Sequence, residues 1–215
     1  MAVRSPLSRV CAFGLLVLSS SLVALGATAA PASAGLGVAC PNPTSQVFLP
    51  WGDGAYYSYV PNGGFESGTG GWALSGGAKV VAGNESLFAH GSGERYSLSL
   101  PAGSSATSPP ICISLLSSKM RFFAANGGSS SSRLKVQVIY NGGTSGLLSL
   151  ATNILGISDF GYVSAGARWQ PSAAIGMLSG TLPVLTQSVQ FRFTPADRNG
   201  SWLIDDIYLD PLMHG

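Results

Sequence analysis

Residues 61–72 read PNGGFESGTGGW and residues 201–210 read SWLIDDIYLD, and these two stretches enclose the region that decides the fold. Between them, short segments with strand-like patterns alternate with turn signals built from Gly, Pro, Asn and Ser. The sequence contains no pattern of a capped amphipathic helix. Many short strands without helices are typical of a β-sandwich or barrel, so we expect an all-β fold.

The expected strands are segments in which apolar and polar residues alternate with the period of a half-buried strand. They cover residues 72–81 (interrupted at Gly76-Gly77), 96–100, 111–113, 119–125, 134–140, 147–150, 189–194 and 202–209. Residues 154–177 are rich in Gly and Ala and fit either a short helix or a long loop, with residues 169–171 at one end of a strand.

The first 34 residues have the composition of a secretory signal peptide. Arg4 and Arg9 precede an apolar run at residues 13–27, and small residues at 32–34 form a cleavage site. The run is short for a helix that spans a membrane, so we expect cleavage, secretion and no membrane anchor. Cleavage leaves 9 of the 11 Lys and Arg residues against 9 Asp and Glu. A neutral chain without a basic stripe argues against nucleic acid as a partner.

Two cysteines remain after cleavage, Cys40 and Cys112. We expect them to form a disulfide, because an even pair of cysteines in an exported chain is usually oxidised. Two alternatives stay open at this point. The first alternative is that both cysteines are free thiols. The second is that Cys40 is lipidated, since residues 37–40 partly resemble a lipobox.

These signals divide the chain into three regions: the signal peptide at 1–34, an irregular N-terminal extension at 35–60, and one β-sandwich domain at 61–212. Prolines and Gly54 argue against a helix in the extension. Its dense aromatic residues favour a flap packed over the core, with a ligand platform as the alternative. We expect the protein to be a monomer.

Several motifs occur in a fixed order along the domain. They are residues 62–68 with Gly71-Trp72, Gly91-Ser92-Gly93 followed by residues 96–100, Trp169-Gln170, and residues 202–209. This ordered set resembles the CenC-type carbohydrate-binding modules, those of the family 4, 9 and 22 type. The resemblance implies a galactose-binding-like jelly-roll β-sandwich in which the two ends meet and hold a structural calcium ion. Cys40-Pro41 with residues 48–51 is similar to the corresponding part of secreted actinobacterial proteins that join such an extension to this domain.

The carboxylates of the two end stretches are the candidate calcium ligands. A carboxylate beside a core strand is costly unless it is paired or bound to metal, and hard oxygen ligands suit calcium. The resemblance implies Glu66 and Asp205 as side-chain ligands, with carbonyls such as that of Gly64 completing the shell. The alternative is that Glu66 and Asp205 only accept hydrogen bonds from the backbone. We expect Asp206 to point the other way, to solvent or to a loop.

A sugar site needs aromatic platforms and planar polar groups on an accessible face. Phe65, Trp72 and Trp202 occupy positions typical of a core. The candidate ligand-binding residues are therefore Trp169, Tyr140, Phe122, Gln137 and Arg192, with a core position as the alternative for Trp169. Adjacent Phe122 and Phe123 face opposite sides of a regular strand, so one of them is expected to face a groove.

The sequence lacks the constellations of a hydrolase. There is no G-x-S-x-G elbow and no H-E-x-x-H motif. Glu85 and Glu94 are carboxylates of the type a glycosidase uses, but solvated loop charges explain them better, and His90 is expected in a loop. We therefore predict a secreted, non-catalytic carbohydrate-binding protein that binds polysaccharide or cell-wall glycan. The alternative is a structural or adhesive surface protein that uses the same scaffold without recognising sugar.

Overall fold

The structure, a computed structural model, describes residues 40, 43–114, 117–141, 158–177 and 186–211. All of them belong to one compact unit, Gly35–Gly215. The predicted signal peptide and the expected strand at 147–150 lie outside the described residues. In the described part of the chain, no helix is long and apolar enough to cross a membrane.

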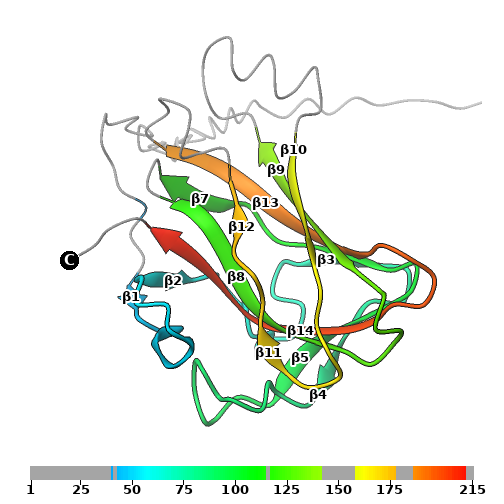
Figure 1. Ribbon diagram of the computed structural model, residues 1–215. Coiled ribbons are helices and arrows are strands. Elements are labelled where there is room, and N and C mark those ends of the chain that lie inside the picture. Colours follow the sequence, from blue (N-terminus) through cyan, green and yellow to red (C-terminus); the bar gives the residue numbers. More distant parts are fainter. Residues whose placement is uncertain (1–39, 41–42, 115–116, 142–157, 178–185, 212–215) are drawn as a thin grey trace, which may run out of the picture. The chain divides into compact units, whose positions relative to one another are not determined.

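The strands form two antiparallel sheets that pack face to face as a jelly-roll β-sandwich (Figure 1). The first sheet contains β1 (Thr44–Ser45), β2 (Tyr57–Tyr59), β4 (Lys79–Ala82), β5 (Tyr96–Pro101), β8 (Ser117–Asn126), β11 (Gln170–Pro171), β12 (Ile175–Gly176) and β14 (Ser201–Pro211). Its order is β1-β2-β14-β5-β4, and β8 pairs with β14, β11 and β12. The predicted all-β sandwich is confirmed.

The second sheet runs in the order β10-β9-β13-β6-β3, with β7 also pairing with β13. Its strands are β3 (Ala73–Ser75), β6 (Ser105–Thr107), β7 (Ile111–Ser114), β9 (Leu134–Asn141), β10 (Ser158–Val163) and β13 (Thr186–Pro195). The expected strand at 72–81 is divided at Gly76-Gly77, because both glycines have positive φ and turn the chain from one sheet to the other. Residues 158–177 form β10, β11 and β12 rather than a helix.

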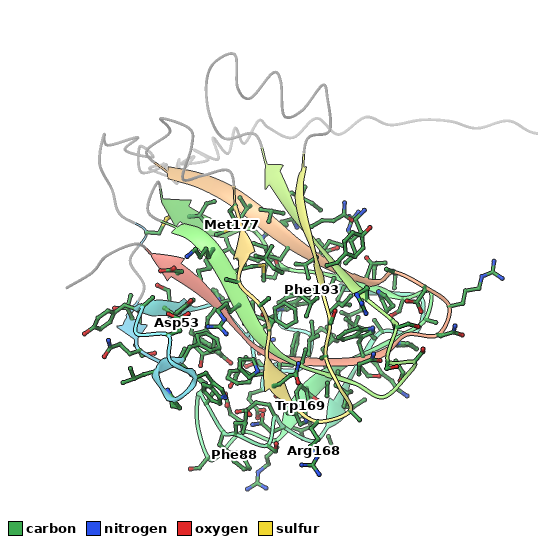
Figure 2. The ribbon with its side chains drawn as sticks, in the orientation of Figure 1. Asp53, Phe88, Arg168, Trp169, Met177 and Phe193 are labelled. Carbon is green, nitrogen blue, oxygen red and sulfur yellow. A yellow bond between two sulfur atoms is a disulfide. The ribbon has the colours of Figure 1, made fainter. Side chains whose placement is uncertain are left out.

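The main core lies between the sheets and follows from the alternation of apolar residues. On β9 and β13 the inward positions are fully buried and apolar: Leu134, Val136, Val138, Val189, Phe191 and Phe193. Phe193, labelled in Figure 2, meets Phe122 of β8 edge-to-face with ring centres 5.1 Å apart. Each buried side chain of this size contributes roughly 1.5–3 kcal/mol to folding.

The N-terminal segment is more regular than the sequence indicated. It forms β1, a 3-10 turn at Leu49–Trp51 and β2, and β2 pairs with β14 through Tyr59 opposite Tyr208. Phe48 packs there with Tyr57, Phe123 and Tyr208 in a second hydrophobic cluster. The segment therefore covers part of the outer face of the first sheet, as a flap. Its two strands and its 3-10 turn are short, so the other described residues of the extension are irregular, as predicted; pairing of β2 with β14 satisfies the backbone of the regular part.

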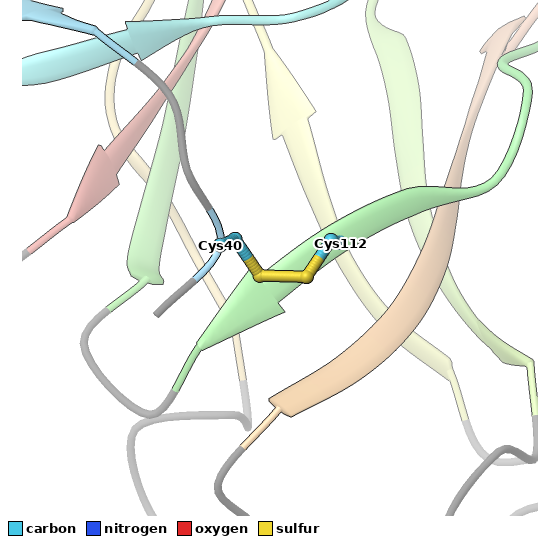
Figure 3. The surroundings of a disulfide bond; sticks show 2 residues. All are labelled: Cys40 and Cys112. Carbon is cyan, nitrogen blue, oxygen red and sulfur yellow. A yellow bond between two sulfur atoms is a disulfide. The ribbon is translucent and has the colours of Figure 1, made fainter. Parts of the chain in front are cut away.

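A disulfide between Cys40 and Cys112 fastens this segment to β7 of the second sheet (Figure 3). The two Cα atoms lie 5.8 Å apart. The structure has the predicted pairing in place of two free thiols or a lipidated Cys40.

The two end stretches meet, as the resemblance to carbohydrate-binding modules implied. The backbone N–H of Val60 donates to the carbonyl of Ile207 at 2.9 Å, and an added Cβ at Gly63 would lie 3.0 Å from that same carbonyl oxygen. A side chain at residue 63 would require the backbone of Val60 or Ile207 to shift by a few tenths of an ångström, so glycine allows the close approach of the two stretches. Residues 61–72 form successive turns rather than a strand, and β14 alone supplies the regular backbone of this contact.

Candidate functional site

The outer face of the second sheet carries a row of polar side chains. Alternate residues of β9 and β13 point away from the core: Lys135, Gln137, Ile139, Gln190, Arg192 and Thr194. Gln137 lies directly opposite Arg192, and Arg192 lies opposite Thr107 of β6. The Nε of Arg192 donates to Thr107 Oγ1 at 3.0 Å. A primary amide, a guanidinium and a hydroxyl thus lie side by side on three neighbouring strands.

Tyr162 of β10 extends this outer face. It lies opposite Lys135 of β9 and exposes 55% of its surface. An exposed aromatic ring beside polar side chains supplies an apolar surface next to hydrogen-bonding groups, the combination typical of binding sites for amphipathic ligands. Sequence reasoning missed Tyr162, because it lies in the Gly-rich stretch that had no clear period. Only its pairing with β9 shows which face it occupies.

The structure brings together only part of the predicted sugar site. Gln137 and Arg192 lie on the outer face of the second sheet, and Tyr140 lies on β9 opposite Val189. Phe122 instead points into the core and is fully buried, so no ligand reaches it. Trp169 is half-buried against the cluster around Phe48, next to β11 of the other sheet (Figure 2).

Phe123 also fails to provide the expected aromatic platform. It does point away from the core, as alternation with Phe122 requires, but the N-terminal segment covers it completely. The outward aromatic residue of β8 is therefore used for packing between the flap and the sheet.

A β-bulge shapes a second polar region, at the middle of β14. Asp205 lies opposite Phe123 and Tyr208 lies opposite Arg121, so two residues of β14 face one residue of β8. The extra residue is Asp206, whose φ of 46° is in the left-handed region. In a regular strand, consecutive side chains point to opposite faces. The bulge removes this restriction and turns both carboxylates toward the loop at residues 83–95.

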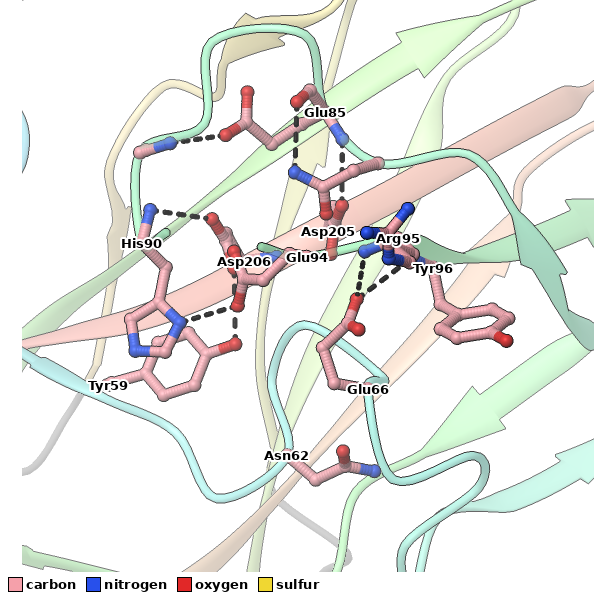
Figure 4. Close-up of polar contacts among 12 residues, drawn as sticks. Tyr59, Asn62, Glu66, Glu85, His90, Glu94, Arg95, Tyr96, Asp205 and Asp206 are labelled. Atoms are coloured by element: carbon pink, nitrogen blue, oxygen red, sulfur yellow. Dashed lines mark hydrogen bonds and ion pairs between the residues drawn. The ribbon is translucent and has the colours of Figure 1, made fainter. Parts of the chain in front are cut away.

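Both aspartates are fully buried and accept hydrogen bonds from this loop (Figure 4). Asp205 Oδ2 accepts from the backbone N–H of Glu85 at 2.9 Å, and Asp206 Oδ2 accepts from that of His90 at 3.1 Å. Asp206 Oδ1 accepts from the Tyr59 hydroxyl at 3.1 Å. Burial, together with the neighbouring carboxylates, raises the pKa of Asp205 to about 9 and that of Asp206 to about 7.

Glu85 of the loop is also fully buried and Glu94 exposes only 10% of its side chain, which corrects the expectation of solvated charges. The carboxylate of Glu85 accepts the backbone N–H groups of Leu87, at 2.5 Å, and Ala89, and it is fully buried. Burial raises the pKa of Glu85 although both hydrogen bonds lower it. Glu94 Oε1 lies 2.5 Å from Nδ1 of His90. The sequence contained no signal for this burial, because the loop folds back onto β14 only in the tertiary structure.

The three predicted calcium ligands have different surroundings. Glu66 is exposed, and its Oε1 accepts the N–H groups of Arg95 and Tyr96 at 2.7 and 2.8 Å. Asp205 accepts from Glu85 and from the N–H of Asp206, so the two carboxylates share no hydrogen-bond partner. Gly64 lies instead beside the side chains of Asp206 and Glu94. A calcium ion held by Glu66, Gly64 and Asp205 stays a prediction.

Comparisons with known proteins found similar solved structures, three of which are described below. No protein-family model matches it, and no curated protein matches it. Among solved structures, it is similar to a family 61 carbohydrate-binding module in complex with β-1,4-galactotriose. The identity is 21%, with 71% of this chain and 97% of that chain covered and a TM-score of 0.44.

Two further solved structures are of the same class. A family 22 xylan-binding domain from Paenibacillus barcinonensis is 16% identical, with 71% and 93% of the two chains covered and a TM-score of 0.39. A family 11 module from Clostridium thermocellum, in complex with a β-1,3-1,4-mixed-linked tetrasaccharide, is 16% identical, with 74% and 98% covered and a TM-score of 0.39. Carbohydrate-binding modules are also the class that the sequence motifs resemble. Similarity at this level does not indicate which ligand this chain binds.

Proposed function

We propose that this chain is a secreted, non-catalytic carbohydrate-binding protein that binds a polysaccharide or cell-wall glycan along the outer face of its second sheet. The observation that carries the proposal is the row of Thr107, Arg192 and Gln137 on three adjacent strands. Sugar hydroxyls both donate and accept hydrogen bonds. This row offers an amide, a guanidinium and a hydroxyl group side by side on one face of the sheet. Tyr162 adds an aromatic surface at the edge of the same face.

Secretion is supported by the disulfide between Cys40 and Cys112, since structural disulfides persist in oxidising compartments. The composition of residues 1–34, typical of a signal peptide, agrees with it. Both support export of the chain to a place where extracellular glycans are available.

The test is affinity electrophoresis of the purified full chain against a panel of plant, fungal and bacterial polysaccharides. We expect retardation by at least one of them. The double variant Gln137→Ala/Arg192→Ala should lose at least about tenfold in affinity, because it removes the two central polar groups. Arg133→Ala is the matched control, since Arg133 is exposed but lies before β9. Equal retardation of the double variant would place the binding site elsewhere.

A second candidate function is that of a structural or adhesive surface protein that recognises no sugar. One observation favours it: of the aromatic side chains that the structure describes on the second sheet, only Tyr162 faces outward. A single ring offers less stacking surface than a row of rings. Failure of the whole polysaccharide panel to bind the wild-type chain would support this candidate and exclude the first.

A further inference from the structure

A group of buried carboxylates lies between the 83–95 loop and the outer face of the first sheet. Asp205, Asp206 and Glu85 are fully buried, and Glu94 exposes only 10% of its side chain. Among the residues that the structure describes, His90 is the one basic side chain that forms an ion pair with any of these four. A buried carboxylate is costly unless it is paired or coordinates a metal, so this group favours an additional cation.

Glu94 and Gly64 show where such a cation would lie. Oε2 of Glu94 is buried and has no hydrogen-bond partner. The backbone of Gly64 lies close to the same side chains: a Cβ added there would meet the Tyr59 hydroxyl, Asp206 Oδ1 at 2.9 Å and Glu94 Oε1 at 3.2 Å. Only a glycine therefore lets the Asp206 and Glu94 carboxylates and the Tyr59 hydroxyl lie this close to the backbone. An unpaired buried oxygen at such a place calls for a ligand, because leaving it unsatisfied costs about 1–3 kcal/mol or more.

Three candidate ligand atoms lie close to one another in this region. One nitrogen of His90 and one carboxylate oxygen each of Glu94 and Asp206 all lie within 4.8 Å of one another. Bonds of about 2 Å to one metal ion place its ligand atoms about 3–4 Å apart, so small side-chain movements would bring all three onto one ion.

Neighbouring groups hold these ligands in place. The Tyr59 ring stacks on the imidazole of His90, with ring centres 3.8 Å apart and an angle of 8° between the planes. The Tyr59 hydroxyl and the backbone N–H of His90 each donate to one oxygen of Asp206. Figure 4 shows these contacts around His90 and Asp206. Outer contacts of this kind orient the ligands of protein metal sites.

We propose that His90, Glu94 and Asp206 bind a divalent transition-metal cation, with zinc as its representative. An imidazole nitrogen beside two carboxylates suits zinc, whereas calcium prefers a shell made of oxygen alone. This donor set differs from the predicted calcium ligands Glu66 and Asp205. It lies on the first sheet, so the proposal does not depend on glycan binding by the second.

The experiment titrates zinc chloride into the full chain, purified without an affinity tag and stripped with EDTA, in an isothermal calorimeter. We expect a single zinc ion to bind, and to bind at least about tenfold more tightly than calcium. His90→Ala should weaken zinc binding at least about tenfold. His90 exposes 44% of its side chain, so this variant keeps the fold. Glu94→Gln tests the second ligand with almost no change of volume.

Two variants serve as matched controls. Glu66→Gln makes the same chemical change as Glu94→Gln at the predicted calcium ligand, and His214→Ala removes the other histidine of the mature chain. Both should bind zinc as the wild type does. The proposal is overturned if the stripped wild type binds no zinc, if His90→Ala and Glu94→Gln leave the affinity unchanged, or if calcium binds more tightly than zinc. Polysaccharide binding is measured separately with EDTA present. This measurement distinguishes failure of the zinc proposal from failure of the proposed glycan binding.

Discussion

Arg121 of β8 and Asp53 of the N-terminal segment form an ion pair in which Nη1 and Oδ2 lie 2.6 Å apart. The same guanidinium donates through Nε to the carbonyl of Ser172 at 3.0 Å and lies 4.2 Å from the centre of the Phe48 ring. Asp53 also accepts a hydrogen bond from the Tyr57 hydroxyl at 2.7 Å. One side chain of the sheet therefore holds the flap and the segment before β12 together.

Arg121→Lys should lower the free energy of unfolding by about 1–2 kcal/mol, because lysine keeps the charge but loses the planar fork that contacts Asp53, Ser172 and Phe48 together. Urea unfolding followed by circular dichroism measures this change. Arg133→Lys is the control, since exposed Arg133 donates to the carbonyls of a loop and should change stability by less than about 0.5 kcal/mol. Equal effects of the two variants would contradict the role given to Arg121.

Acid should weaken the attachment of the flap. Burial alone raises the pKa of Asp53, but hydrogen bonds from Tyr57, the Ala55 N–H and Arg121 outweigh it and lower this pKa below its ordinary value of 3.8. The stabilisation is therefore present above the unfolded pKa and is lost as pH falls through the lowered folded pKa. The stability difference between wild type and Asp53→Asn should shrink from about pH 6 to about pH 2. A difference that stays constant with pH would show that the charge of Asp53 contributes nothing.

Loss of the disulfide should destabilise the chain substantially. Cys40 and Cys112 are 72 residues apart, and closing a loop of this length stabilises by about 4 kcal/mol in the chain-entropy model. The double variant Cys40→Ser/Cys112→Ser should show this loss in guanidinium unfolding, and the reduced wild type should match it. If reducing agent leaves the unfolding midpoint of the wild type unchanged, the bond does not stabilise the fold.

Phe122→Leu should separate stability from ligand binding. Phe122 is fully buried against Phe193, so the smaller side chain should cost about 1–3 kcal/mol through lost contacts and a cavity. Glycan affinity at a temperature where the variant is folded should equal that of the wild type. A weaker affinity of the folded variant would indicate that Phe122 contributes to the ligand site, which its burial argues against.

Most strands could be predicted because their alternation is local. The patterns at residues 96–100, 134–140 and 189–194 correspond to β5, β9 and β13, and each places most of its apolar residues inward. The polar pair of Gln137 and Arg192 was predicted for the same reason. That these two residues lie directly opposite one another depends on the register of β9 and β13, which no local pattern specifies.

The polar region on β14 could not be predicted in the same way. A bulge at Asp206 breaks the strict alternation of the strand, so the two aspartates do not point in opposite directions. Glu85 and Glu94 have the flanking glycines and polar residues of a solvated loop, yet Glu85 is fully buried and Glu94 exposes only 10% of its side chain, because the loop closes over β14. The strands of the N-terminal segment were not predicted, because its Pro and Gly residues argue against a strand in the sequence alone. β2 forms because it pairs with β14, which lies far away in the chain.

The sequence by itself determined the all-β sandwich and the disulfide, because periodicity, turn residues and cysteine parity are local or compositional properties; the meeting of residues 61–72 with β14 was implied only by the resemblance of the motifs to carbohydrate-binding modules. Only the tertiary structure decided which face each polar residue occupies and which charges are buried. It covered Phe123 with the flap, exposed Tyr162 beside Lys135 and gathered His90, Glu94 and Asp206. Contacts between residues far apart in the chain depend on how the strands are paired and on the bulge at Asp206. A shift of the strand pairing by one residue would move every side chain of that strand to the opposite face of the sheet.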